Sequence, residues 1–146
     1  MKRLQSLILL LAAVGISGCD PQSRGFSLPP GDTQRGEQVF LNMQCLGCHT
    51  MEGYERPENT EDLSIALGGK VKSIKTYGEL VTSVIHPSHK LAKGYDMSKI
   101  QNEEGQSVMP VYNDVMTVSE LVDLVTFLES RYELEVYEPT DYSTRH

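Results

Sequence analysis

The chain has few cysteines, no excess of basic charge and no apolar run long enough to cross a bilayer. A membrane-spanning helix needs about 20 apolar residues, and the run from Leu7 to Ala13 is much shorter. Lys and Arg number 13 against 20 Asp and Glu, for a net charge of -7, which argues against nucleic acid as a partner. Three cysteines cannot all pair, so one of them needs a separate explanation.

Residues 1–18 have the features of an export signal. A basic start precedes the run from Leu7 to Ala13, which has the length of a signal-peptide core. The next stretch, Ile16 to Cys19 (I-S-G-C), resembles the lipobox of bacterial lipoproteins. That resemblance implies cleavage before Cys19 and lipid on its sulfur and new amino group, where several acyl chains anchor stably. Asp20 implies retention at the inner membrane, with the domain facing the periplasm.

The rest of the chain divides into a tether, one domain and a tail. Residues 19–31 are rich in Pro, Gly and Ser and form the predicted tether between the acylated cysteine and the domain. Residues 32–132 carry the apolar periodicity of a folded domain. Residues 133–146 are acidic, have no core pattern and form the predicted tail.

Three apolar stripes predict three helices. The first begins near Asp32 or Thr33, since either can cap it, and runs towards the cysteines. The second begins at the capping box from Thr76 to Glu79 and ends before Pro87. The third begins at the capping box from Thr117 to Glu120 and has the clearest apolar stripe. No strand pattern is strong, so we predict an all-α fold.

The stretch from Gln44 to Thr50 (Q-C-L-G-C-H-T) contains a C-x-x-C pair, which occurs in redox dithiols, zinc sites and haem attachment. A dithiol is typical of a βαβ context, whereas here a predicted helix precedes the pair. A zinc site needs two further ligands at motif spacing. The remaining cysteine is Cys19, and His86 and His89 lie in no finger or ribbon pattern. Both hypotheses stay as weaker alternatives.

Cys45, Cys48 and His49 together form C-x-x-C-H, a signature of covalent haem attachment. In this interpretation the two cysteines form thioethers to the ring and His49 binds the iron. Lipid on the remaining cysteine, Cys19, would leave the other two as a pair. We therefore predict one covalent haem c as the cofactor.

The sixth position of the iron decides what such a site does. A protein ligand makes an electron carrier, whereas an open position makes a gas-binding, sensory or catalytic protein. Met109, fixed by the following Pro110, is the favoured ligand because it lies shortly before the last predicted helix. Met97, His86 and His89 are the competing candidates, and an open site remains a further alternative.

Residues 32–132 resemble class I cytochrome c of bacteria. Four features carry the resemblance: a glycine and an aromatic before the motif, the motif itself, a Met-Pro pair, and an apolar pattern in the last helix (Gly36 and Phe40; Cys45, Cys48 and His49; Met109 and Pro110; Leu124, Phe127 and Leu128). It implies three to five helices wrapped around one haem, with the first and last helices crossing where Gly36 lets Phe40 pack on Phe127. It also implies electron transfer with no catalytic residues, so the protein is not expected to be an enzyme.

Two features depart from the family pattern. No glycine-proline loop follows His49, so the carbonyl that accepts its ring N–H is unidentified, and Asp62-Leu63 marks the equivalent place. The segment from Tyr77 to Tyr95 resembles haem domains fused to, or partnered with, periplasmic dehydrogenases, so a fixed subunit is an alternative to a mobile carrier. The six lysines between Lys70 and Lys99, against two acidic residues, predict a redox partner with an acidic docking surface, held by an attraction that salt would screen.

Overall fold

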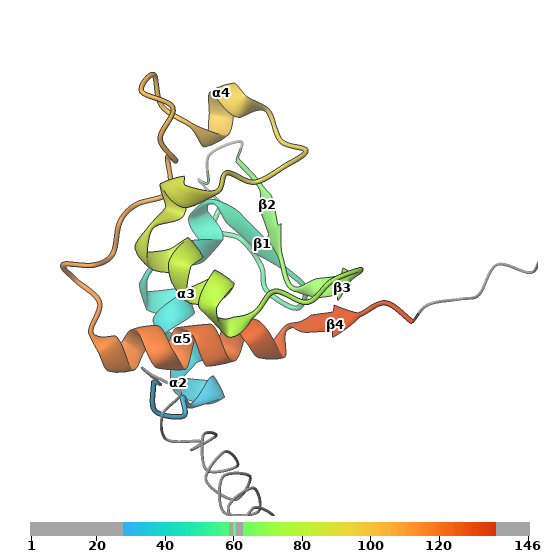
Figure 1. The fold of residues 1–146 in the computed structure, drawn as a ribbon, viewed down its shortest axis with the longest axis vertical. Helices are drawn as coiled ribbons and strands as arrows, with labels where there is room; N and C mark the ends of the chain where they lie inside the picture. The colour runs from blue at the N-terminus through green and yellow to red at the C-terminus, as the bar shows by residue number, and fades with distance from the viewer. Residues whose placement is uncertain (1–27, 59, 61–62, 137–146) are drawn as a thin grey trace, which may run out of the picture.

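Four α-helices form the framework of the part of the chain that the computed structural model describes, residues 28–58, 60 and 63–136 (Figure 1). The α-helices are α2 (Thr33–Asn42), α3 (Tyr77–Ile85), α4 (Met97–Ile100) and α5 (Val118–Ser130). Two short 3-10 helices, η2 (Cys45–Gly47) and η3 (Pro87–His89), accompany them. The predicted signal, Cys19, Asp20 and residues 137–146 of the tail lie outside the described residues. None of the described helices combines the length and apolarity needed to cross a membrane.

The three predicted helix starts are confirmed. The carboxylate of Asp32 accepts the backbone N–H of Arg35 and caps α2. Thr76 caps α3 and Thr117 caps α5, each in a reciprocal capping box with the glutamate three residues on. The sequence did not predict α4, because four residues are too few to display a helical period.

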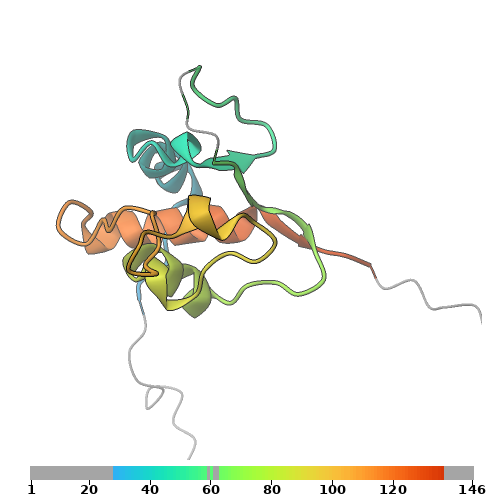
Figure 2. The ribbon, with the colours of Figure 1, turned by 90° about the horizontal axis from the view of Figure 1, so that it is seen from above.

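Helices α2 and α5 cross in contact, as predicted, and α2 passes behind α5 in Figure 1. The crossing is close because Gly36 has no side chain: a Cβ there would lie 2.6 Å from the carbonyl carbon of Asp123 and 2.7 Å from Cβ of Phe127. The rings of Phe40 and Phe127 then pack with centroids 5.5 Å apart. Helix α3 contacts α5 as well, and Figure 2 shows α5 lying between α2 and α3.

A buried carboxylate holds the start of α2 against α5. Asp123, 6% exposed, accepts the backbone N–H of Asp32 at 2.6 Å. It also accepts Nε of Arg35 at 2.7 Å and a second guanidinium nitrogen of the same residue at 3.2 Å. The hydrogen bonds from Arg35 and Asp32 lower the pKa of Asp123 despite its burial, so the carboxylate stays charged in the folded protein.

The helical core agrees with the predicted all-α fold, and four short strands that the sequence did not predict accompany it. They form two parallel pairs, β1 (His49–Met51) with β2 (Ile65–Leu67) and β3 (Gly69–Val71) with β4 (Tyr132–Leu134). Each strand has three residues, too few for a visible alternation of polar and apolar side chains. The turn between β2 and β3 uses Gly68 and Gly69 at φ +76° and +78°, a region that other residues rarely adopt.

Candidate functional site

The cysteines lie on one tight turn between α2 and β1. Gln44, at φ 55° in the left-handed region, follows the C-cap of α2 and directs the chain into η2, which begins at Cys45. The N–H of Cys48 donates to the carbonyl of Cys45 at 3.3 Å and closes the turn. Both thiols are free and partly buried, and burial raises the pKa of Cys45 to about 11. Cys45 is therefore presented as a neutral thiol on the same turn as Cys48, with His49 next in the chain.

A parallel strand pair orients His49. The register pairs His49 with Ile65, and the N–H of Ile65 donates to the carbonyl of Cys48 at 3.0 Å. The ring Nδ1 of His49 lies 3.2 Å from the carbonyl oxygen of Ile65, so Nδ1 carries the proton and Nε2 is left to bind a metal. The acceptor that the sequence left unidentified is thus Ile65, two residues after Leu63.

The surroundings of His49 favour its neutral form. Burial lowers its pKa, the Ile65 carbonyl acts in the opposite direction, and the positive charge of Arg56 adds to the lowering. A neutral imidazole is the form that binds a metal ion.

His49 and Met109 both line an apolar cavity of about 250 Å³ in the middle of the domain. Its walls come mainly from apolar side chains of α2, α3, β2 and α5 (Phe40, Leu80, Val84, Ile65, Leu67, Leu124 and Leu128). A second cleft, of about 720 Å³, shares Cys45, His49 and Met109 and adds Cys48 and Pro110. One thiol, one imidazole and one thioether therefore line the apolar cavity, and the second thiol lines the cleft that shares these residues. This donor set fits a large flat ring with a central iron.

Polar groups line part of the same cavity. Lys75, Ser83, Lys93 and Tyr95 are among its lining residues, and the hydroxyl oxygen of Tyr95 accepts the N–H of Ala66 at 3.0 Å. Ammonium and hydroxyl groups of this kind can receive the two carboxylates of a haem while the apolar walls cover its ring. The residues present thus fit both the apolar and the charged parts of the group.

Hydrogen bonds hold the segment that carries Met109. The N–H of Met109 donates to the hydroxyl oxygen of Ser107 at 3.1 Å, and the N–H of Val108 donates to the carbonyl of Ile100 at 3.1 Å. On the other side the hydroxyl of Tyr112 donates to the carbonyl of Met43 at 3.2 Å, which connects this segment to the end of α2. Tyr112 also lines the cavity, although the sequence analysis did not single it out. Its position, three residues after Met109, was the only feature of the sequence that could have indicated this role.

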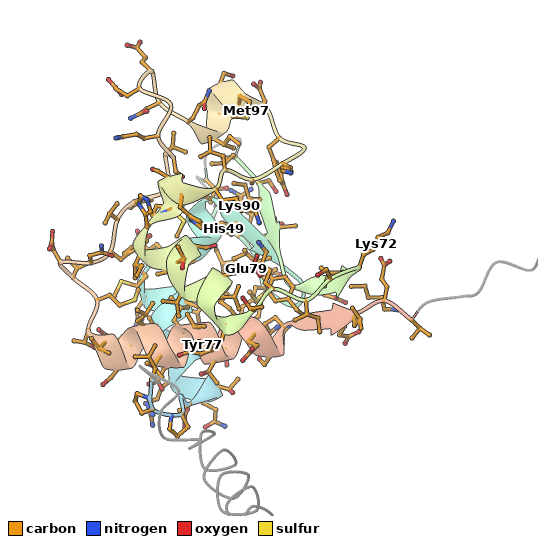
Figure 3. All side chains as sticks on the ribbon, in the orientation of Figure 1. His49, Lys72, Tyr77, Glu79, Lys90 and Met97 are labelled. Carbon is orange, nitrogen blue, oxygen red and sulfur yellow. The ribbon has the colours of Figure 1, made fainter. Side chains whose placement is uncertain are left out.

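The competing ligands lie elsewhere. Met97 is on α4, 45% exposed, and Figure 3 shows it well apart from His49. His86 and His89 are exposed at the end of α3, with ring centroids 6.1 Å apart. The described residues that line the cavity include Met109 but not Met97, His86 or His89.

The other predicted site residues lie in three different places. Phe40 and Leu124 line the cavity, so they would contact the bound group. Gly36 and Phe127 lie at the helix crossing instead and act by bringing α2 onto α5. Pro110 borders the outer cleft beside Met109.

Sequence reasoning missed one residue beside the attachment turn. Arg56, in the loop after β1, donates from Nε to the carbonyl of Leu46 at 3.0 Å and from one terminal nitrogen to the carbonyl of Gly47 at 2.7 Å. The same nitrogen lies 2.8 Å from the carbonyl of Leu63. No motif marks this arginine in the sequence, because these three partners are backbone atoms.

Comparison with known proteins identifies the family. A family model described as Cytochrome c matches residues 33–131, well over half of the chain. Searches of curated proteins and of solved structures found no match. The matched range runs from the first residue of α2 to the residue after α5 and includes Cys45, Cys48, His49 and Met109. The chain therefore belongs to the cytochrome c family, and it is an electron-transfer protein that binds haem c covalently.

Proposed function

We propose that this protein carries single electrons through one haem whose iron is bound by His49 and Met109. The observation that supports the proposal most is that both side chains line one apolar cavity bordered by Cys45, with the imidazole oriented by the carbonyl of Ile65. Haem supplies the change between ferric and ferrous iron, and the chain supplies ligands, covalent attachment and burial. The thioether of Met109 favours the ferrous state, so the potential is higher than with two imidazoles.

Ligation of the iron by Met109 also favours electron transfer over catalysis as the function of the site. An electron carrier must keep the sixth position of its iron filled, because small ligands bind to an open position. The hydrogen bonds to Ser107 and Ile100 hold the Met109 segment beside the cavity and so support a permanent ligand. All six lysines between Lys70 and Lys99 are exposed, which supports a partner with an acidic docking surface.

Replacing Met109 with leucine tests the axial ligand. Leucine has a similar volume, so the change in side-chain packing should cost less than about 1.5 kcal/mol, but leucine has no sulfur to bind iron. We expect the variant to lose the weak far-red absorption band of methionine-ligated ferric haem, to bind CO when reduced and to have a lower midpoint potential. Visible spectra and a redox titration measure these changes.

Met97→Leu is the matched control, because Met97 is exposed on α4 and should leave spectrum and potential unchanged. A wild-type protein that binds CO readily when reduced would contradict the proposal, as would a far-red band that survives in Met109→Leu. A band lost in Met97→Leu instead would move the ligand to that residue.

We also propose that lipid on Cys19 holds the domain at a bacterial inner membrane, facing the periplasm. The lipobox and the tether at residues 19–31 support this proposal. Cys19→Ala is expected to move most of the protein from the membrane fraction to the soluble fraction after a salt wash, because it removes the acylation site. Cys48→Ala serves as a control and should remain in the membrane fraction. A Cys19→Ala protein that still sediments with membranes would exclude the lipid anchor.

A further inference from the structure

Arg56 connects two backbone segments that belong to different parts of the haem site. Its guanidinium donates to the carbonyls of Leu46 and Gly47, the two residues between Cys45 and Cys48. It also donates to the carbonyl of Leu63, in the segment that leads into β2. A planar guanidinium suits such a task, because its donors have fixed directions and it stays charged at all working pH values.

The second segment reaches the iron ligand through one further contact. Two residues after Leu63, the carbonyl of Ile65 accepts the ring N–H of His49. The side chain of Arg56 therefore links the turn that attaches the ring to the strand that sets the direction of the imidazole. The backbone joins the turn to β2 at one point, where the N–H of Ile65 donates to the carbonyl of Cys48. Arg56 adds a second connection, through Leu46, Gly47 and Leu63, which the β1–β2 pairing leaves out.

We propose that Arg56 is a positioning residue of the haem site, which fixes the attachment turn relative to the strand that orients His49 and sets a permanent positive charge beside that turn. The proposal deepens the proposed function and rests on His49 as the axial ligand. A fixed positive charge stabilises the ferrous state, which carries one positive charge fewer than the ferric state. Arg56 thus contributes both to the direction of the imidazole and to the midpoint potential.

Two substitutions separate these contributions. Arg56→Gln removes the charge, and at a fixed solution potential the ferric-to-ferrous ratio is expected to rise several-fold, where tenfold corresponds to about 59 mV for a one-electron couple. Arg56→Lys keeps the charge but loses the fork of donors, so it should restore most of the potential. Both variants should change the paramagnetic NMR shifts of the haem methyl groups in the ferric protein, because these shifts depend on the orientation of the axial imidazole.

Arg131 offers a matched control elsewhere in the domain. It also donates to a backbone carbonyl, that of Glu52 at 2.9 Å, and its guanidinium lies over the rings of Tyr54 and Phe127, 5.6 Å and 6.0 Å from their centroids. These contacts lie away from the attachment turn and from Leu63, so Arg131→Gln should lower the unfolding temperature and leave the potential and the methyl shifts unchanged.

The outcomes distinguish this inference from the proposed function. A wild-type spectrum without signs of His/Met ligation would overturn the proposed function itself. A normal wild-type spectrum, together with Arg56 variants that unfold more easily but keep the wild-type potential and methyl shifts, would overturn the positioning role alone. If Arg56→Gln does not fold, the Arg56→Lys variant tests the positioning role by itself. Haem methyl shifts equal to those of the wild type in Arg56→Lys would exclude that role.

Discussion

Replacing both Cys45 and Cys48 with alanine is expected to abolish covalent haem and to leave little folded protein. Without thioethers the ring is held by its axial ligands and by packing alone. If the ring is lost, the domain must retain or collapse an apolar cavity of about 250 Å³. At about 24 cal/mol per Å³ of cavity, an empty space of that size costs on the order of 6 kcal/mol. Typical domains have only about 5–15 kcal/mol of total stability.

Two measurements check this expectation. A haem stain on a denaturing gel detects covalently bound haem and should be blank for the double variant. Circular dichroism should show a large loss of helix. Cys45→Ala and Cys48→Ala alone each keep one thioether and should retain part of the stain, whereas Cys19→Ala should retain all of it. A stained band from the double variant would mean that the haem is attached through other residues.

Gly36→Val is expected to prevent α2 from packing on α5. Any Cβ at this position would lie 2.6 Å from the carbonyl carbon of Asp123, and closer still to its oxygen. These are backbone atoms of a helix, so they cannot rotate away as a flexible side chain would. Overpacking usually costs about 1–3 kcal/mol; here we expect more, because relief requires separation of the two helices and of the Phe40–Phe127 contact.

Gly78→Ala is the control for that variant. Gly78 is also a helical glycine, in α3, but a Cβ added to it would have no described atom within 4 Å beyond its own helix and chain neighbours. Alanine there should leave stability unchanged or raise it by up to about 1 kcal/mol. Chemical denaturation of the haem-loaded proteins compares the two. Equal unfolding midpoints for Gly36→Val and the wild type would show that the α2–α5 crossing tolerates a side chain at position 36. The close backbone contact at Gly36 would then be wrong.

Local sequence patterns were sufficient for the helix starts. Asp32, Thr76 and Thr117 each satisfy backbone donors within three residues, so the interactions that start α2, α3 and α5 are contained in short stretches of sequence. The attachment motif is local for the same reason, since Cys45, Cys48 and His49 are held on one turn and the first residue of the next strand. Such features depend little on the rest of the chain.

The strands and the orientation of His49 depend on contacts between distant parts of the chain. The acceptor Ile65 is 16 residues from His49, and the segment between them has no period that would predict the pairing. Three-residue strands gain their stability from the partner strand, and a partner cannot be deduced from the strand itself. The expected position near Asp62-Leu63 was therefore close to Ile65 but could not specify which carbonyl accepts the ring N–H.

Sequence alone determined the cofactor chemistry of this protein, because C-x-x-C-H, the Met-Pro pair and the glycine and aromatic residues of the first helix are local and chemically specific. Tertiary structure decided which methionine lies at the cavity, which carbonyl orients His49 and what Arg56 connects. Met97 and Met109 are both methionines in irregular segments of the sequence, and only the folded chain places one of them in the wall of the cavity and the other on an exposed helix. The physical reason is that a ligand set is defined by distances between side chains, and these distances exist only once α2, α3 and α5 have packed together.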